Sequence, residues 1–312
     1  MPTPAIDVAH VSYDYGRRRA LDDLTLSIDE GEIFVLLGPN GGGKTTLFRL
    51  LATLIPPQQG DVRILGLDVR TQTYEVRLAI GVVFQAPSLD KKLSVNENLA
   101  CQGALYGLGG TTLRRRQQEM LTRLGLADRA RDKVETLSGG LRRRVDLAKG
   151  MMHHPRLLLL DEPSTGLDPN ARSDLWNYLE EVRAGGVTVV LTTHLLEEAE
   201  RADRIAILNQ GKLVALDTPA NLRALVGGDS ITIQTADPES LAQKVRDRLG
   251  CPASVVDGSV RLELEGGHAW IPRLVDAFPD QISSLTLGKP TLEDVFIART
   301  GHRFWNEGAG RG

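Results

Sequence analysis

The sequence predicts an α/β fold followed by a smaller α+β domain, and three observations lead to this prediction. The apolar run 33–37 precedes a glycine-rich turn and then the helical spacing of residues 47–52. A second aliphatic run, residues 157–160, ends in two adjacent carboxylates. Beyond residue 228 the pattern changes to short alternating strands and two amphipathic helices. Buried strands that alternate with helices indicate a parallel sheet with helices on its faces.

The glycine-rich turn is Gly38-Pro39-Asn40-Gly41-Gly42-Gly43-Lys44-Thr45-Thr46, which has the complete pattern G-x-x-x-x-G-K-T of a phosphate-binding loop. Glycines let backbone N–H groups turn inward around phosphate oxygens, and the following helix directs its positive end at the same anion. We expect Lys44 to reach the β- and γ-phosphates and the Thr45 hydroxyl to hold Mg²⁺. A plain strand-to-helix turn explains the glycines but not the Lys-Thr pair at this offset.

Length and composition narrow the class of protein. The 312 residues suit one large domain plus a smaller one, and a net charge of −3 provides no basic field for nucleic acid. Cys101 and Cys251 lie far apart without metal-type spacing, which favours two free thiols in a reducing cytoplasm. Residues 1–10 lack the pattern of a signal peptide. The apolar runs are far shorter than the roughly 20 residues that span a membrane.

Two aromatic residues and one glutamine are candidates near the loop. Strands are expected over residues 5–13 and 24–28, and Tyr13 or Tyr15 would then be available to stack on a nucleotide base. An ordinary strand aromatic is the alternative, and the residues alone do not choose. The strand expected over residues 80–84 ends in Gln85. In a parallel sheet Gln85 would lie beside the phosphate loop, because ligands gather at the carboxyl ends of strands.

Residues 86–150 are predicted to form an inserted helical subdomain. Strand signals disappear there, and helical periodicity marks residues 95–106, 113–124 and 141–152. Ser138, Gly139 and Gly140 open the last helix, with Ser138 as a natural N-cap. They could form a second anion site through exposed backbone donors. Taken alone, a simple helix start is the better interpretation.

The aliphatic strand at residues 157–160 ends in Asp161 and Glu162. The first carboxylate suits Mg²⁺, and the second can orient or deprotonate an attacking water. His194 follows the strand expected over residues 187–191, which places it near the same site, although a lone histidine is more often structural. The next glutamates are expected to form a solvated helix face: Glu197, Glu198 and Glu200.

Gly227 and Gly228 mark the expected domain boundary, so the larger domain covers residues 4–228 and an accessory domain and tail cover 229–312. The second region has the order β-α-β-β-α-β of a ferredoxin-like domain, followed by a helix over 291–300 and a loose tail. It lacks a phosphate loop and an acidic pair at a strand end, so we expect it to regulate or dimerise. The expected elements are strands at 230–235, 254–256, 260–264 and 282–287 and helices at 238–249 and 269–278.

Together the motifs resemble those of an ATP-binding cassette (ABC) ATPase over about residues 4–226. The resemblance implies a P-loop NTPase fold with antiparallel N-terminal strands and an inserted helical subdomain. It also implies that ATP and Mg²⁺ bind and that ATP is hydrolysed to ADP and phosphate. The order and spacing of the motifs are highly specific. One departure is Leu141, which stands where the signature motif usually ends in Gln.

Carried over one by one, the functional positions of the family fall on residues described above. Residues 38–46 match the Walker A loop, 137–141 the signature motif, 158–162 the Walker B motif and 164–168 the D-loop. The resemblance assigns adenine stacking to Tyr15, completion of a partner's site to Ser138, Gly139 and Gly140, metal binding to Thr45, Gln85 and Asp161, and catalysis to Glu162 and the switch histidine His194.

Residues 192–200 and 291–296 resemble the ABC-2 exporter branch, which includes daunorubicin-resistance-type and nodulation-export ATPases. This narrower resemblance implies a dimer with a second copy of the chain, closing head to tail on MgATP. It also implies a separate transmembrane permease subunit, through which the chain would sit on the cytoplasmic face of the inner (plasma) membrane.

Two rival functions have to be weighed. A soluble ABC protein acting on ribosomes or DNA usually carries paired cassettes or a long coiled-coil insert, and this chain has neither. A regulatory ATP-binding subunit with little hydrolysis is disfavoured by Glu162 and His194, while Leu141 leaves that alternative slightly open. The sequence gives neither the transported substrate nor the direction of transport.

Overall fold

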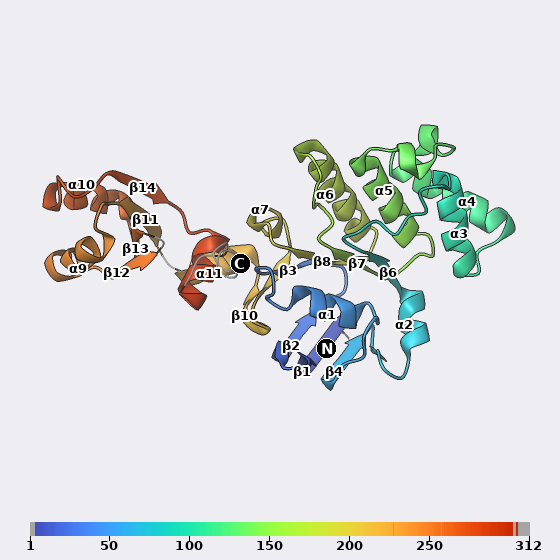
Figure 1. The fold of residues 1–312 in the computed structure, drawn as a ribbon, viewed down its shortest axis with the longest axis horizontal. Coiled ribbons are helices and arrows are strands. Elements are labelled where there is room, and N and C mark those ends of the chain that lie inside the picture. Colours follow the sequence, from blue (N-terminus) through green and yellow to red (C-terminus); the bar gives the residue numbers. More distant parts are fainter. Residues whose placement is uncertain (1–3, 227, 257, 302–303, 305–312) are drawn as a thin grey trace. The chain divides into compact units, whose positions relative to one another are not determined.

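The computed structural model describes residues 4–226, 228–256, 258–301 and 304 (Figure 1). The chain forms two compact units, residues 1–213 and 214–312, and each is described here by itself. The expected boundary at residues 227–228 stays a prediction; Gly227 lies outside the described residues, as does the expected loose tail at 305–312.

The first unit is built on a parallel sheet that places several strand ends at one edge. In the described residues the sheet order is β10-β9-β3-β8-β7-β6, and its edge strand β10 crosses the division of the chain after residue 213. Leu37 pairs with Thr193 and Asp161 with Thr192, so β3, β7 and β8 end side by side. All three strands are fully buried, as expected for parallel strands covered on both faces. The bounds are β3 Ile33–Leu37, β6 Ile80–Val83, β7 Leu157–Asp161, β8 Thr188–Thr193, β9 Arg204–Asn209 and β10 Lys212–Asp217.

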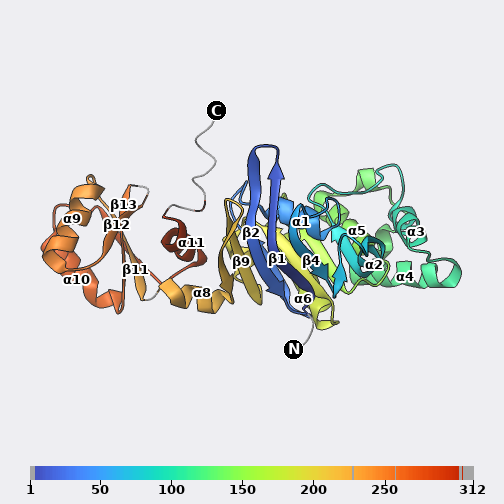
Figure 2. The same ribbon diagram turned by 90° about the horizontal axis from the view of Figure 1, so that it is seen from below.

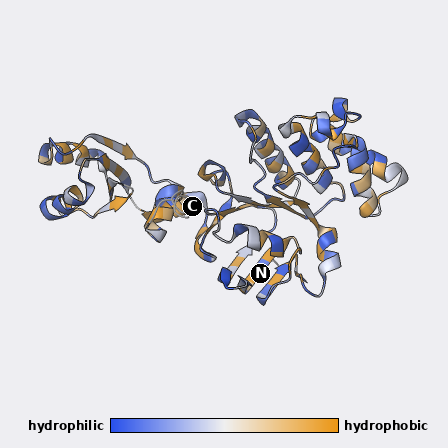
Figure 3. Ribbon diagram, viewed as in Figure 1, coloured by the Kyte–Doolittle hydropathy of each residue, from blue (hydrophilic) through white to orange (hydrophobic). Residues whose placement is uncertain are grey.

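Helices cover this sheet on two sides, and Figure 1 shows α1 (Lys44–Leu51) on one side with α5 (Gly139–Gly150) and α6 (Pro169–Ala184) on the other. Figure 3 shows hydrophobic residues running through the strands between them. A very close approach fixes α5 against β6, because a Cβ atom added to Gly81 would lie 2.3 Å from the Gly150 carbonyl oxygen. The sheet edge and α5 are therefore held together by backbone packing.

A second, antiparallel sheet has the order β2-β1-β4-β5 (Figure 2). Its strands β1 and β2 come before the phosphate loop in sequence, and β4 and β5 come after it. Its first hairpin is longer than expected, because β1 continues to Tyr15 and pairs with Arg18 across a turn at Gly16, whose φ is +60°. Glycine adopts this left-handed conformation without steric cost. The bounds are β1 Ile6–Tyr15, β2 Arg18–Ile28, β4 Gln59–Ile64 and β5 Leu67–Asp68.

The expected helices of residues 86–150 are present as α3 (Val95–Leu105), α4 (Gly110–Arg123) and α5, after a short α2 (Thr73–Ala79). The last helix starts at Gly139, directly after the expected N-cap and two residues before the periodic stretch begins, and the Ser138 hydroxyl accepts a hydrogen bond from the Leu141 N–H (3.3 Å). The prediction of Ser138 as the N-cap is confirmed.

The second unit contains the predicted β-α-β-β-α-β order, with its strands arranged β12-β13-β11-β14. Its core includes Ile231, Leu241 and Leu262. Outside that sheet, α8 (Pro219–Val226) packs on α11 (Leu292–Thr300). The remaining bounds are β11 Asp229–Gln234, α9 Pro238–Leu249, β12 Ala253–Val256, β13 Ser259–Leu264, α10 Gly267–Ala277 and β14 Ser284–Gly288.

A chain ending after Asp217 tests whether the nucleotide site belongs to the first unit alone. This cut keeps β10 whole and removes α8 together with its packing partner α11. We expect cooperative unfolding and the same rise in melting temperature with MgATP as in the full chain, because a ligand stabilises the fold that binds it. Thermal denaturation with and without MgATP measures both.

A chain ending after Gly228 is the matched control. It keeps α8 without α11, which exposes the buried side chain of Leu222, so we expect a lower melting temperature than for the shorter chain. A cooperative transition that does not respond to MgATP in the shorter chain would contradict the assignment of the site to the first unit.

Candidate active site

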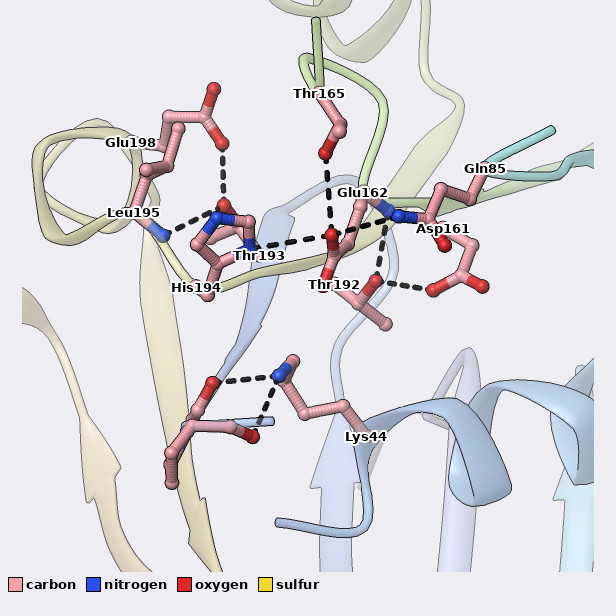
Figure 4. Close-up of polar contacts among 12 residues, drawn as sticks. Lys44, Gln85, Asp161, Glu162, Thr165, Thr192, Thr193, His194, Leu195 and Glu198 are labelled. Carbon is pink, nitrogen blue, oxygen red and sulfur yellow. Dashed lines mark hydrogen bonds and ion pairs between the residues drawn. The ribbon is translucent and has the colours of Figure 1, made fainter. Parts of the chain in front are cut away.

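The phosphate loop connects β3 to α1 and holds a buried ammonium group. Lys44 is 4% exposed, and its Nζ donates hydrogen bonds to the carbonyl oxygens of Gly38 (2.6 Å) and Pro39 (3.0 Å) (Figure 4). The N-cap of α1 is Gly43, which has no side chain to occupy the first N–H groups of the helix. Those donors and the ammonium together suit a phosphate group.

Steric constraints explain why glycines are needed in this loop. A Cβ atom on Gly38 would lie 2.3 Å from the carbonyl oxygen of Leu208, and one on Gly43 would lie 2.9 Å from that of Ala20. Gly43 also has a φ of +107°, a conformation that other L-residues rarely adopt. The loop is therefore fixed against β2 and β9 and needs no ligand contact to account for its shape.

A cavity of about 150 Å³ lies over this loop, and the residues that line it separate the two tyrosine candidates. Tyr15, which is 43% exposed, belongs to the lining, whereas Tyr13 packs beside it at 5.0 Å between ring centroids. The geometry therefore favours Tyr15 as the base-stacking residue. The lining consists of Tyr15, Arg18, Ala20, Asn40, Gly41, Gly43, Lys44, Thr45, Thr46 and Glu162.

Three polar side chains converge on the carboxylate of Glu162, two from the ends of neighbouring strands and one from the loop after β7. Gln85 Nε2 donates to Glu162 Oε2 at 3.2 Å, and His194 Nδ1 lies 3.3 Å from the same oxygen. Thr165 Oγ1 donates to it at 3.2 Å (Figure 4). The structure thus brings together Gln85, Glu162 and His194, as the sequence predicts. Thr165 is an addition, because a threonine in a turn-rich loop gives no sequence signal of its own.

Asp161 is held separately, through Thr192 on the adjacent strand. Thr192 Oγ1 donates to Asp161 Oδ1 at 2.6 Å and accepts a hydrogen bond from the Glu162 N–H at 2.9 Å. Burial raises the pKa of Asp161 above its ordinary value, the Thr192 hydrogen bond opposing this. Burial lowers the pKa of Lys44, and the nearby charges of Glu162 and Asp161 oppose that shift. Both charged forms are therefore costly without an added counter-charge.

The glutamates after His194 correct one prediction. Glu197 and Glu200 are exposed as expected, but Glu198 is 2% exposed and accepts a hydrogen bond from Thr193 Oγ1 at 2.6 Å. Thr193 Oγ1 in turn accepts a hydrogen bond from the Leu195 N–H at 3.0 Å. The expectation of a fully solvated face was wrong because α7 is a single turn, Leu196–Ala199, too short for periodicity to show which side faces the sheet. Glu198 instead fixes the backbone on both sides of His194.

Ser138, Gly139 and Gly140 lie at the start of α5 and are not among the described residues that line the cavity over the phosphate loop. Gly140 lines a different cleft, between α5 and α6. The structure of one chain therefore does not join the signature residues to Lys44.

ATP and Mg²⁺ fit the residues that are present. The glycine loop has backbone donors and a buried ammonium for phosphate, and Thr45 and Asp161 carry oxygen atoms of the kind that Mg²⁺ prefers. Among the described residues, no group of three or more His, Cys, Asp or Glu side chains forms a metal site by itself. Phosphate oxygens would have to complete the metal's coordination, as is usual for Mg²⁺ in nucleotide sites.

A phosphate-binding loop facing paired carboxylates at the carboxyl edge of a parallel sheet defines the class of P-loop nucleoside triphosphatases. Within this class the comparisons are specific. The family model described as ABC transporter matches residues 21–165, and an AAA-domain model matches residues 141–200.

Relatives match nearly the whole chain. A daunorubicin resistance ATP-binding protein of Streptomyces coeruleorubidus is 41% identical, covering 94% of each chain. The Nod factor export ATP-binding protein I of Rhizobium leguminosarum bv. viciae is 37% identical, covering 95% of each chain. The linearmycin resistance ATP-binding protein of Bacillus subtilis is 32% identical, covering 95% of this chain and 98% of the relative. The chain belongs to the ATP-binding subunits of ABC transporters and is an ATPase of that family.

Solved structures agree with this assignment. The cbiO1 protein of Clostridium perfringens, part of an ABC transporter complex, superposes with a TM-score of 0.67 at 26% identity, covering 80% of this chain and 97% of that one. An ATP-binding cassette in a dimeric post-hydrolysis state with ADP and Pi has a TM-score of 0.62 at 29% identity, covering 68% and 98%. In the described part of this chain, no helix has the length and apolar character needed to cross a membrane.

Replacing Asp161 by Asn should make the nucleotide-free protein more stable at neutral pH. Because burial raises the pKa of Asp161, its ionised form costs folding free energy above that pKa, and the cost vanishes once pH falls below the ordinary value of about 4. We therefore expect Asp161→Asn to raise the melting temperature at pH 7 to 8, with a smaller gain as pH falls towards 5. Thermal denaturation across pH measures the effect.

The exposed Asp128→Asn variant serves as the control and should change little at any pH. In Asp161→Asn the additional stabilisation that Mg²⁺ gives in the presence of ATP should be lost. A lower melting temperature than wild type at pH 8 would show that Asp161 is not under electrostatic strain in the folded state.

Proposed function

We propose that this chain hydrolyses MgATP at the carboxyl edge of the large sheet and that hydrolysis drives an exporter through a separate membrane subunit. The observation that carries the proposal is the Glu162 carboxylate, held by Gln85, Thr165 and His194 and lining the same cavity as Lys44. A carboxylate in that position can polarise a water molecule for attack on the γ-phosphate.

The residues divide the work as follows. Lys44 and the N–H groups at the start of α1 bind the phosphates, and Tyr15 stacks on the adenine. Thr45, Gln85 and Asp161 hold Mg²⁺, which neutralises phosphate charge when bound. Glu162 accepts a proton from the attacking water. The water oxygen forms a bond to the γ-phosphorus, and the bond between that phosphorus and ADP breaks. His194 stabilises the γ-phosphate as charge develops, and its loop is fixed by Thr193 and Glu198.

Export is supported by the relatives rather than by the site. Relatives that match over nearly the whole chain are named for drug resistance or Nod factor export. A membrane permease partner would hold the chain at the cytoplasmic face of the inner membrane. The alternative of a soluble or regulatory ATPase without transport finds no support in these names, and the intact Gln85–Glu162–His194 arrangement speaks against a non-hydrolysing subunit.

A second copy of the chain is the partner that the site needs. Ser138, Gly139 and Gly140 carry the donors expected over the γ-phosphate, yet they lie outside the cavity of their own chain. A partner placed head to tail would bring its α5 N-terminus over Lys44. The dimeric post-hydrolysis state of a related cassette supports a partnership of two chains.

Two substitutions separate hydrolysis from binding. Glu162→Gln should lower ATP turnover by about 100-fold or more while MgATP binding persists, because an amide is a poor base. Lys44→Ala should weaken binding itself, since it removes a cation from the phosphates. Steady-state ATPase rates and equilibrium nucleotide binding measure the two effects.

Glu197→Gln is the matched control, because Glu197 is exposed and close in sequence to His194. It should hydrolyse ATP at the wild-type rate. Turnover near that rate in Glu162→Gln would remove Glu162 from the catalytic role.

A further inference from the structure

One face of α5 carries a row of three polar side chains, two of which are buried. Arg143, Asp146 and Lys149 are spaced three residues apart, so they follow one another along the helix. Arg143 is 6% exposed, and its Nη1 lies 3.8 Å from Oδ2 of Asp146. A buried cation of this kind is costly unless its donors are satisfied.

The donors of Arg143 are satisfied by the backbone next to the active site. Its guanidinium donates to the carbonyl oxygens of Pro163 (2.6 Å) and Phe84 (2.6 Å). Longer hydrogen bonds reach the carbonyl oxygens of Glu162 (3.2 Å) and Asp161 (3.4 Å). A single side chain thus connects the segment that contains Glu162 to the residue immediately before Gln85.

Glu162 needs such support because its backbone is strained. Its φ is +41°, in the left-handed region that is unfavourable for a non-glycine residue. The N–H of Glu162 is held by Thr192, and its carbonyl oxygen is held by Arg143. Because both peptide groups of the residue are fixed, the direction of the Glu162 Cα–Cβ bond, from which the side chain starts, is fixed as well.

The loop after β6 is held by the same row. Asp146 Oδ1 accepts hydrogen bonds from the N–H and hydroxyl of Ser88, both at 3.2 Å. Lys149 Nζ donates to the Ser88 carbonyl oxygen and to its hydroxyl. Gln85 therefore lies between two points, Phe84 and Ser88, that α5 holds in place.

We propose that Arg143 is a positioning residue for hydrolysis, which sets the orientation of Glu162 and Gln85 from the same helix that carries the signature residues at its start. The proposal rests on the proposed role of Glu162 in hydrolysis. It follows that a shift of α5 moves the backbone at Glu162 and the backbone at Gln85 together. Lysine cannot replace the arginine fully, because an ammonium lacks the planar fork that reaches several carbonyl groups at once.

The test compares Arg143→Gln and Arg143→Lys with Arg144→Gln, a control on the same helix whose side chain pairs with Asp174. We expect Arg143→Gln to lower kcat by about 10- to 100-fold, since small misplacements of catalytic groups have effects of that size. The KM for ATP should stay within about 3-fold of the wild-type value. The increase in melting temperature that MgATP gives should equal that of wild type within error. The kcat of Arg143→Lys should lie between those of Arg143→Gln and wild type, and the kcat of Arg144→Gln should match wild type.

Each outcome decides the proposal. A fall in kcat with unchanged KM and unchanged MgATP stabilisation supports positioning. If Arg143→Gln loses stability without nucleotide, stabilisation by MgATP and kcat all together, the role of Arg143 is purely structural. If Arg143→Gln does not fold, Arg143→Lys decides, because it keeps the buried cation; wild-type kcat in it would overturn the proposal. If Glu162→Gln abolishes turnover while both Arg143 variants retain it, this inference fails and the proposed function stands.

Discussion

One buried ammonium and two carboxylates at a single sheet edge are the constraint on which the rest of the structure depends. Lys44 and Asp161 have their pKa values shifted by burial in the directions that disfavour their charged forms. The parallel strands β3 and β7 cannot move these groups apart without breaking the buried sheet. In the proposed function, a magnesium-bound triphosphate would supply the missing counter-charges, so ligand binding would relieve a strain that the fold maintains.

The sequence predicted those parts of the site that follow from strand order. In a parallel sheet the residues after each strand share one edge, so Gln85, Glu162 and His194 were expected together, and the structure confirms that proximity. The β-α-β-β-α-β order after residue 228 was also predictable, because short alternating strands between amphipathic helices leave few arrangements. The residues alone did not choose between Tyr13 and Tyr15, which lie two positions apart on β1; the family resemblance pointed to Tyr15, and the cavity lining supports it.

Residues whose role depends on tertiary placement were missed. Glu198 belongs to a one-turn helix, and only the position of that turn on the sheet makes its carboxylate buried. Arg143 lies among three consecutive arginines, and the sequence does not show which of them faces the interior. Its burial is decided by the close approach of α5 to β6, which brings the helix face onto the carbonyl groups at two strand ends. Contacts made to backbone atoms of distant segments have no signature in the residues contacted.

The shared active site is the central claim, and a mixed dimer tests it most directly. One chain carries Lys44→Ala and the other Ser138→Arg, so each homodimer has two defective sites. In the mixed dimer one site combines both defects, whereas the other joins an intact loop to an intact Ser138. Purified through two different tags, the mixed dimer should regain ATP-dependent closure or ATP hydrolysis. A verified mixed dimer that shows neither would contradict the account, because a loop and signature that met within one chain would leave every site broken.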